Sequence, residues 1–200
     1  MLRRLFDLVV AAVVLVVTSP LLLFALIAVP LESRGSAIFR QRRVGLDGRE
    51  FEVIKLRTMV SGAENLGAGL AVSENDERIT RLGALLRRSS VDELPNLINV
   101  LRGEMALIGP RPTVAAQVEQ YTERQRRRLE IRPGITGWAQ VNGRAGLPWD
   151  ERIELDLWYI DNRSWKLDRQ ILRRTFSTVF GAGDLYREDG PAWRKRDEDQ

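Results

Sequence analysis

The chain has 200 residues and a formal net charge of +4, and it contains neither Cys nor His. These absences exclude thiolate and imidazole chemistry, disulfides and zinc sites built from Cys and His. Any reaction must therefore use Asp, Glu, Ser, Thr, Tyr, Lys or Arg. Any metal must be a hard cation bound by oxygen, with Mg²⁺ as the first choice.

The positive charge is almost entirely arginine, since lysine occurs only at Lys55, Lys166 and Lys195. The guanidinium group offers a planar fork of donors that fits phosphate. This composition therefore favours nucleic acid, an anionic membrane surface or a phosphorylated substrate as the partner. A codon bias toward high GC content would produce the same ratio of arginine to lysine, so composition alone leaves both explanations open.

The first predicted element is an apolar block near the N-terminus. Leu8 to Leu31 comprises 24 residues without a charge, enough to span the hydrocarbon core of a bilayer. Ser19-Pro20 lies near its middle, where the proline predicts a kink. Basic residues flank both ends, which disfavours a spanning helix under the positive-inside rule and favours a helix–break–helix that enters and leaves one leaflet. A kinked spanning helix is the alternative, and in either case the hydroxyls of Thr18 and Ser19 are candidates to bind the carbonyls that the break frees.

The rest of the chain predicts a mainly α-helical catalytic domain with a small β-hairpin, an α+β fold, over residues 34–185. Loose alternation of apolar residues predicts the hairpin, and helical spacing of apolar residues predicts five helices. The expected elements, in chain order, are a membrane segment 1–33, strands 37–44 and 50–56, a loop 61–76, helices 77–88, 92–101 (closed by Gly103) and 114–130, a loop system 133–148, helices 149–161 and 165–180, and a disordered charged tail 186–200.

An acidic pair, Asp92-Glu93, opens the helix expected at 92–101. One interpretation is structural: Ser90 and Glu93 fit a capping box, or Asp92 caps the helix with Pro95 inside its first turn. The other is functional, because a helix start attracts anions and adjacent carboxylates point in different directions. One acid could then attack a phosphate while the other holds a metal ion. The dipeptide alone does not decide between these interpretations.

Arginine residues stand out at two further places. Pro110 and Pro112 stiffen the backbone around Arg111, which suits a phosphate clamp, although a turn with an exposed arginine is the alternative. The predicted hairpin also brings basic residues together, for which a solvated face near anionic lipid is the plainer interpretation. These residues are Arg40, Arg42, Arg43, Lys55 and Arg57 on or beside the hairpin, with Arg87 and Arg88 before the acidic pair.

A segment rich in glycine runs from Pro133 to Arg144. Glycine permits close approach of the backbone to a ligand, and the polar side chains of Gln140, Asn142 and Arg144 could recognise one beside Trp138. A turn-rich loop with a packed tryptophan is the alternative interpretation.

Five motifs occur in a fixed order: Ser19-Pro20, Lys55-Leu56-Arg57-Thr58-Met59, Asp92-Glu93-Leu94-Pro95, Gly109-Pro110-Arg111-Pro112 and Pro133-Gly134-Ile135-Thr136-Gly137. From about Leu2 to Phe180 the chain resembles the bacterial sugar transferase family, the monotopic phosphoglycosyl transferases, and it looks like their minimal members. The resemblance implies transfer of a sugar phosphate from a UDP-sugar to polyprenyl (undecaprenyl) phosphate, giving polyprenyl-diphosphate-sugar and UMP. This would be the first membrane step in assembly of an exopolysaccharide, O-antigen, capsule or glycoprotein glycan.

The resemblance also implies residue roles. Asp92 would attack the sugar-bearing phosphorus and form an aspartyl phosphosugar intermediate, and Glu93 would bind Mg²⁺ beside it, so both carboxylates are candidate metal ligands. Arg87 and Arg111 match the phosphate-contacting arginines of the family. The further candidate contacts to substrate or phosphate are Lys55, Arg57, Pro110, Pro112, Gln140, Asn142 and Arg144.

Ser19-Pro20 matches the break of the family's re-entrant helix. The resemblance thus implies a location in the inner leaflet of the bacterial cytoplasmic membrane, with the catalytic domain on the cytoplasmic face. Three alternatives stay open: a catalytically silent scaffold, a nucleic-acid binder, and an enzyme in which the lipid phosphate attacks directly while Asp92 only binds metal. The apolar block and the lack of aromatic residues among the basic clusters argue against nucleic acid. The sugar, the pathway, the lipid length and the oligomeric state stay open, a homodimer being one arrangement.

Overall fold

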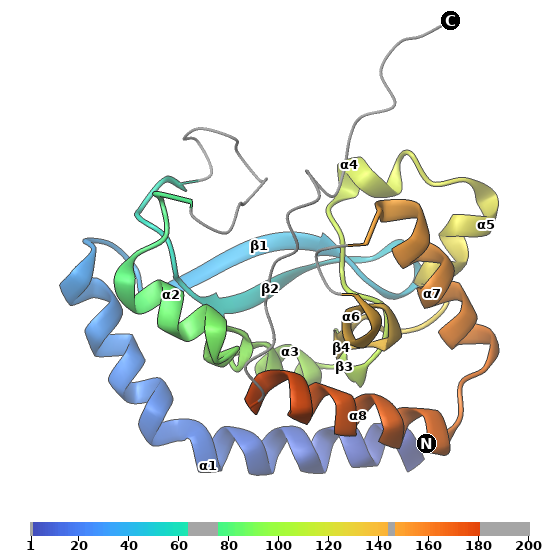
Figure 1. Ribbon diagram of the computed structural model, residues 1–200, viewed down its shortest axis with the longest axis horizontal. Coiled ribbons are helices and arrows are strands. Elements are labelled where there is room, and N and C mark those ends of the chain that lie inside the picture. Colours follow the sequence, from blue (N-terminus) through green and yellow to red (C-terminus); the bar gives the residue numbers. More distant parts are fainter. Residues whose placement is uncertain (1, 64–75, 144–146, 181–200) are drawn as a thin grey trace, which may run out of the picture.

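The computed structural model describes residues 2–63, 76–143 and 147–180 (Figure 1). Most of the loop expected at 61–76, Arg144 and the tail expected at 186–200 lie outside these ranges. Within them the fold is mainly helical with two small two-stranded sheets, which confirms the helical class and the hairpin and adds a sheet that was not expected. The elements are α1 (Leu2–Glu32), β1 (Ile38–Val44), η1 (Leu46–Gly48), β2 (Glu50–Leu56), α2 (Arg81–Arg88), η3 (Val91–Glu93), α3 (Asn96–Arg102), β3 (Ala106–Ile108), α4 (Ala115–Val118), α5 (Glu123–Arg126), η4 (Arg127–Leu129), β4 (Gly134–Thr136), α6 (Trp138–Asn142), α7 (Trp149–Asp161) and α8 (Trp165–Phe180).

The long helix α1 runs along one side of the domain and bends partway along its length (Figure 1). Pro20 lies inside it and lacks the N–H that would bind the carbonyl four residues earlier. That carbonyl belongs to Val16, and it accepts a hydrogen bond from Ser19 Oγ at 2.8 Å. The hydroxyl of Thr18 binds the carbonyl of Val14 at 2.7 Å. The expected role is confirmed for Ser19, whereas Thr18 binds a carbonyl that Pro20 does not free. The expected helix–break–helix is a single bent helix instead, because the hydroxyl of Ser19 satisfies the freed carbonyl.

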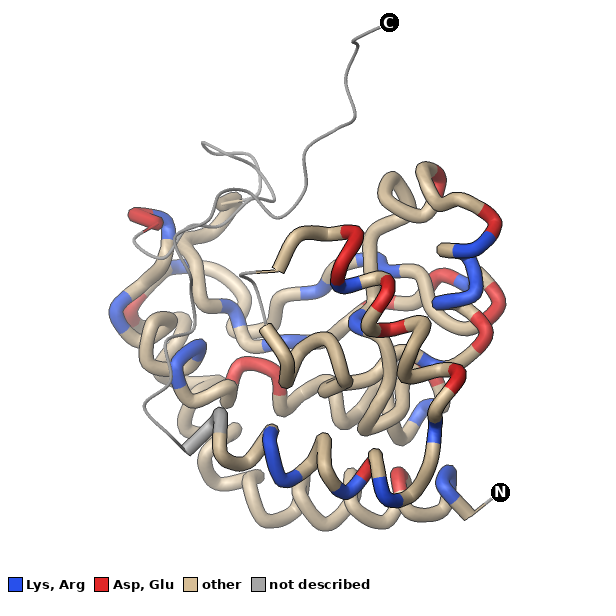
Figure 2. The backbone as a smooth tube through the Cα atoms, turned by 45° about the vertical axis from the view of Figure 1, so that its right-hand side comes forward, with Lys and Arg blue, Asp and Glu red and all other residues tan. Residues whose placement is uncertain are grey.

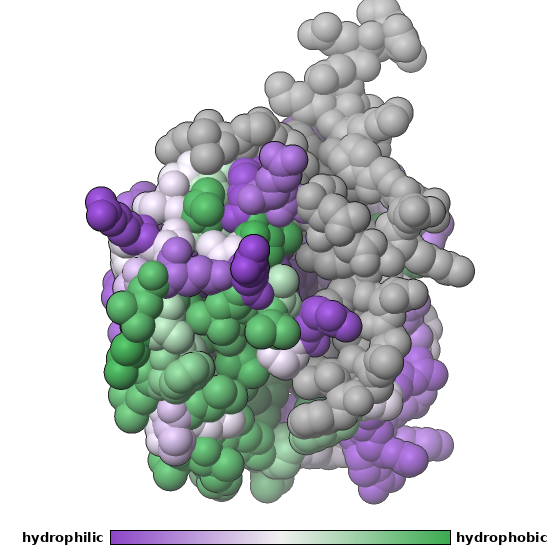
Figure 3. Space-filling view, turned by 60° about the vertical axis from the view of Figure 1, so that its left-hand side comes forward, coloured by the Kyte–Doolittle hydropathy of each residue, from purple (hydrophilic) through white to green (hydrophobic). Residues whose placement is uncertain are grey.

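Most apolar side chains of α1 face away from the domain. Val16 is 73 % exposed and Phe24 is 63 % exposed. The tube of α1 in Figure 2 is almost free of charge between its ends, and Figure 3 shows apolar residues gathered on the side of the molecule that α1 covers. By length and composition α1 could cross a membrane, although the same is true of some core helices and signal sequences.

Both ends of α1 contact the same domain. Near its start, Arg4 donates hydrogen bonds to the carbonyls of Val100, at 2.6 Å, and Met105, at 3.2 Å. At its end, the carboxylate of Glu32 accepts the backbone N–H of Leu82 at 3.1 Å. The helix thus begins against α3 and ends against α2.

Three apolar clusters form the core. The central one packs α1 against α3, β3, α7 and α8, and the second packs the later half of α1 against β2 and α2. The third consists of Val44, Val118, Tyr121, Ile153 and Leu157 with neighbouring apolar residues, and none of its members among the described residues comes from α1. The end of β1 at Val44 therefore lies in the part of the domain that packs independently of the apolar helix.

The segment expected as a loop at 133–148 contains β4 and α6 instead. β4 pairs in parallel with β3, a strand that the sequence did not predict. The two backbones approach closely at glycine: a Cβ on Gly109 would lie 2.4 Å from the carbonyl oxygen of Arg132, and one on Gly134 would lie 2.1 Å from the nitrogen of Gly109. Only glycine therefore fits where the turn after β3 meets β4.

Several predicted helix boundaries were wrong. The helix expected at 77–88 begins at Arg81, and that expected at 92–101 is the 3₁₀ turn η3 followed by α3, which Gly103 closes at φ 88°. Ser90 adopts a left-handed conformation and makes no side-chain cap, so the expected capping box is absent. The helix expected at 114–130 is three short pieces, because Thr122 is extended and starts α5 with a capping box to Gln125.

Candidate active site

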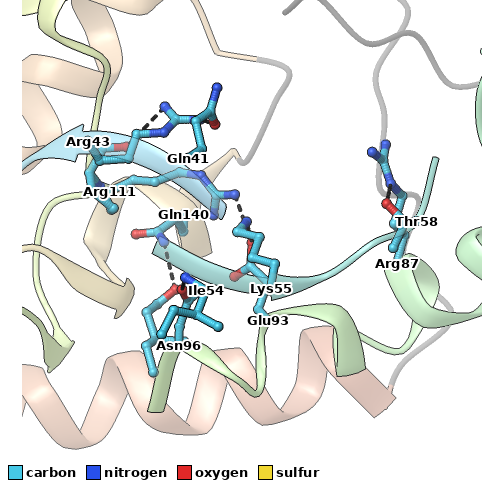
Figure 4. Close-up of polar contacts among 12 residues, drawn as sticks. Gln41, Arg43, Ile54, Lys55, Thr58, Arg87, Glu93, Asn96, Arg111 and Gln140 are labelled. Carbon is cyan, nitrogen blue, oxygen red and sulfur yellow. Dashed lines mark hydrogen bonds and ion pairs between the residues drawn. The ribbon is translucent and has the colours of Figure 1, made fainter. Parts of the chain in front are cut away.

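Three charged side chains from separate parts of the chain meet beside the hairpin. Lys55 Nζ on β2 and Arg111 Nη2 in the turn after β3 both donate to Oε1 of Glu93, at 2.6 and 2.8 Å (Figure 4). The side chains of Lys55 and Glu93 are about one-fifth exposed, whereas that of Arg111 is half exposed. The structure thus brings together three of the residues proposed from the sequence.

Two buried asparagines hold these elements in register. The backbone N–H of Ile54 donates to the side-chain oxygens of Asn96 and Asn99, each at 3.2 Å. The amide of Asn99 in turn donates to the carbonyl of Glu52 at 2.6 Å. Since Ile54 precedes Lys55 and Asn96 follows Glu93 by three positions, these bonds fix β2 against the acidic pair. The sequence analysis missed both asparagines, because their targets are backbone atoms of a distant strand.

The ion pairs determine the protonation of Glu93. Burial alone would raise the pKa of this carboxyl, but the charges of Arg111 and Lys55 and their hydrogen bonds hold the pKa well below its usual range. Burial lowers the pKa of Lys55, and the charge of Glu93 opposes that change. Glu93 is therefore an ionised carboxylate, and its Oε2 atom takes no part in these bonds.

Asp92 is in a different state. Its half-buried carboxylate makes no hydrogen bond or ion pair with any residue in the described part of the chain. Burial, followed by the charge of Glu93, raises its pKa to about 6, against the opposing charges of Lys55, Arg87 and Arg111. At neutral pH the group is mostly ionised and unpaired, which is the state that a carboxylate nucleophile requires.

Of the other predicted site residues, some lie at the site and one is used elsewhere in the fold. Arg87, in the last turn of α2, donates from Nε to Thr58 Oγ1 at 2.8 Å and interacts electrostatically with Asp92. Pro110 and Pro112 flank Arg111 as expected. Arg57, by contrast, is buried. Its guanidinium donates to the carbonyls of Ser36 (2.6 Å) and Gly35 (3.4 Å) in the turn after α1, and to that of Met59 (3.2 Å). Its donors are thus used to hold the end of α1.

The two polar residues predicted in the glycine-rich segment, Gln140 and Asn142, differ in whether their side-chain oxygens have a hydrogen-bond partner. Gln140 donates to the carbonyl of Ile135 at 3.0 Å, and its buried Oε1 lacks a partner among the described residues. The amide oxygen of Asn142 accepts Arg174 Nη1 at 2.6 Å, and its nitrogen binds the carbonyl of Trp138 at 2.8 Å. Gln140 keeps a free acceptor, whereas Asn142 is occupied by its own helix and by α8.

Arg128 is a third residue that the sequence analysis missed. It is 5 % exposed, and it donates to Asp156 Oδ2 at 2.8 Å, to the hydroxyl of Tyr121 and to the carbonyl of Arg111 at 3.0 Å. Its guanidinium also lies 5.3 Å from the ring of Trp149. Arg128 therefore anchors the backbone of Arg111 from behind. In the sequence it is one of four arginines near the end of the helix expected at 114–130, and only burial distinguishes it from the exposed Arg124 and Arg126.

The two carboxylates suit a hard cation that is shared with a ligand. No group of three or more acidic residues that could hold a metal occurs in the described part of the chain. Mg²⁺ binds through one or two carboxylates when substrate phosphates complete its shell. The free oxygens of Asp92 and Glu93 match that chemistry, and the cations around them suit the phosphates.

An unpaired carboxylate beside an ion-paired one, ringed by cations and set next to a long apolar helix, defines a site for an anionic ligand at an apolar surface. The family model described as bacterial sugar transferase matches residues 1–182. The chain is 45 % identical over 178 residues to the sugar transferase EpsL of Bacillus subtilis, covering 89 % of this chain and 87 % of EpsL. The chain thus belongs to the bacterial sugar transferase family.

Two relatives carry more specific names. A UDP-glucose:undecaprenyl-phosphate glucose-1-phosphate transferase of Caulobacter vibrioides is 42 % identical over 92 % of this chain and 72 % of its own length. The transferase of the same name in Escherichia coli is 43 % identical over 90 % of this chain, which corresponds to 40 % of the longer E. coli protein.

Proposed function

We propose that this protein transfers a sugar 1-phosphate from a UDP-sugar to undecaprenyl or a similar polyprenyl phosphate, giving a polyprenyl-diphosphate-sugar and UMP. The observation that supports this function most directly is the unpaired, ionised carboxylate of Asp92 among Lys55, Arg87 and Arg111. The names of the Caulobacter and Escherichia relatives, which specify UDP-glucose and undecaprenyl phosphate, support the same reaction. A transferase named for UDP-N-acetylgalactosamine is 40 % identical, so the identity of the sugar is left open.

In the proposed mechanism a carboxylate oxygen of Asp92 attacks the phosphorus that bears the sugar. The bond from that phosphorus to the bridging oxygen breaks, and its electron pair leaves with UMP. The aspartyl phosphosugar is then attacked by an oxygen of the lipid phosphate, which forms the diphosphate and releases Asp92 as a carboxylate. The pKa of about 6 keeps Asp92 ionised at neutral pH and still makes it an adequate leaving group.

The surrounding residues position and neutralise charge, which is most of what phosphoryl transfer requires. Lys55 and Arg111 fix Glu93 and face the negative charge of the diphosphate. Bound Mg²⁺, held by oxygens of Asp92 and Glu93, would neutralise the diphosphate further. Arg87 stands beside Asp92 as an additional phosphate contact.

We further propose that α1 is re-entrant, with both ends on the cytoplasmic side of the inner membrane. The contacts of Arg4 with α3 and of Glu32 with α2 support this topology, because they hold both ends of α1 against one domain, whereas a helix that crossed the bilayer would have its ends on opposite sides of it. The natural absence of cysteine allows a clean test. Leu2→Cys and Arg34→Cys should both react with an impermeant maleimide only in inverted membrane vesicles. Labelling of the two positions from opposite sides would contradict the proposal.

The mechanism is tested by intact mass spectrometry. Purified protein with Mg²⁺ and a panel of UDP-sugars, without lipid, should gain one sugar phosphate and release UMP. Asp92→Asn should abolish both signals, whereas Asp161→Asn, which changes an exposed carboxylate, should retain them. UMP release only after addition of polyprenyl phosphate would refute the covalent intermediate and favour direct attack by the lipid. No release with either would favour the scaffold alternative.

A further inference from the structure

Arg43 is a cation beside the site that the proposed mechanism does not use. It lies on β1, where Nη2 donates to Gln41 Oε1 at 2.5 Å and Nη1 donates to the carbonyl of Pro112 at 3.4 Å (Figure 4). Its Nε is buried and has no hydrogen-bond partner within the described residues. A buried donor without a partner is costly, so the guanidinium is held in place but incompletely satisfied.

The charges around Arg43 indicate what would satisfy it. Burial and the neighbouring charge of Arg111 lower the pKa of Arg43 to about 10, and the charge of Glu93 opposes them. Glu93 is already shared by Lys55 and Arg111, so it cannot also neutralise Arg43. The cations facing this region outnumber the two carboxylates. Two adjacent guanidinium groups with excess positive charge form the kind of fork that binds a phosphate.

The position of Arg43 distinguishes between two sources of phosphate. The backbone N–H of the next residue, Val44, donates to the carbonyl of Thr113 at 2.8 Å, so Arg43 lies at the end of β1 that joins the segment between β3 and α4. Figure 1 shows this end of β1 near α4 and α7, away from the apolar helix. A lipid phosphate would approach along α1, whereas a soluble nucleotide can enter from the side where β1 ends.

We propose that Arg43, with Arg111, binds the nucleotide phosphate that leaves as UMP; this inference rests on the proposed function. When Asp92 attacks the sugar-bearing phosphorus, negative charge develops on the oxygen that bridges to the second phosphorus. The electron pair of the broken bond goes to that oxygen. Arg43 donates to the departing phosphate and stabilises the charge, while Gln41 holds the guanidinium in orientation.

The test is equilibrium binding of UMP by calorimetry to the whole chain, which does not depend on turnover. Arg43→Ala should weaken UMP binding about 10- to 100-fold, the range expected for losing a hydrogen bond to a charged group. Binding of uridine, which has no phosphate, should not change. Arg42→Ala is the matched control, because alternation along β1 puts this exposed arginine on the opposite face. If the alanine variant does not fold, the same measurement of UMP affinity is made on Arg43→Gln, which keeps a polar side chain but loses the charge, and the same weakening is expected.

Two results would overturn the inference while leaving the proposed function intact. UMP affinity in Arg43→Ala within twofold of that in Arg42→Ala would show that Arg43 does not bind this phosphate. A rise confined to the KM for polyprenyl phosphate would show that Arg43 binds the lipid phosphate instead. Failure of the proposed function would give a different result. The wild-type chain would bind UMP more tightly than Arg43→Ala does, and yet the wild type would form neither the adduct nor the product.

Discussion

Asp92→Asn should make the protein more stable at neutral pH while abolishing its activity. The fold holds an ionised carboxylate half-buried next to the negative charge of Glu93, without a hydrogen bond from any described residue. The carboxamide is nearly the same size and bears no charge. Removing the charge therefore relieves both the desolvation and the repulsion, which proteins tolerate at functional sites.

The pKa gives the size of this effect. A rise from 3.8 to about 6 corresponds to about 3 kcal/mol if the whole shift reflects the folded state. Solvent contact and the coupling to Glu93 reduce this to about 1–2 kcal/mol. Between these two pKa values the folded state binds more protons than the unfolded state, so wild-type stability falls as pH rises through that window. Above pH 6 the wild type has lost all the stability that ionisation of Asp92 removes, and Asp92→Asn does not undergo this loss.

Thermal unfolding in detergent, followed by tryptophan fluorescence at pH 4 and pH 8, measures the difference. The midpoint of Asp92→Asn should exceed that of the wild type by about 2–8 °C at pH 8, and the gap should nearly close at pH 4. Asp161→Asn is the control of opposite sign, because a hydrogen bond from Arg127 lowers the pKa of Asp161. If Asp92→Asn is no more stable than the wild type at pH 8, the carboxylate is not strained and this account of its reactivity is wrong.

Three further variants test the supports of the site. Arg128→Lys keeps the charge but loses the fork that holds the carbonyl of Arg111. Turnover, assayed at a temperature well below that of unfolding, should therefore fall about tenfold, and UMP affinity should change less. Gly109→Ala should lower the free energy of unfolding by about 3 kcal/mol or more in denaturant titrations, because its Cβ would meet backbone atoms. Arg4→Gln should destabilise the fold by about 1–3 kcal/mol through loss of its bond to Val100, and unchanged stability would refute that anchoring role.

The sequence predicted the elements whose signal is local. The hairpin and the last two helices appear at nearly the expected residues, since alternation and helical spacing define them within a single segment. Ser19-Pro20 likewise predicted the hydroxyl that satisfies the freed carbonyl, although α1 continues through the proline as one helix. By contrast, β3 and β4 have three residues each and become strands only by pairing with each other across 25 intervening residues or more. A strand of that length has no readable period.

The sequence identified most of the residues of the site, but it did not predict how they contact one another. Both Asp92 and Glu93 were identified, but their different states follow from Arg111 and Lys55, which are 18 and 38 residues from Glu93 in the chain. Arg57 and Lys55 stand two positions apart in one motif and were treated alike. Their side chains leave the strand end in different surroundings, one among backbone carbonyls and one beside a carboxylate. Only the tertiary fold separates a structural arginine from a lysine that faces the site.

The short helix α3 links the apolar helix to the chemistry. Its first residue, Asn96, comes three positions after Glu93, and carbonyls near its C-terminal end bind Arg4 of α1. A helix of seven residues is about 10 Å long, so α3 is a short link between the acidic pair and the start of α1. A lipid phosphate at a membrane surface could then reach the phosphorus bound to Asp92 without leaving the interface. Because each displacement at phosphorus is in line, the lipid phosphate attacks the aspartyl phosphosugar from the side that UMP has left, so UMP must depart before the lipid phosphate takes its position.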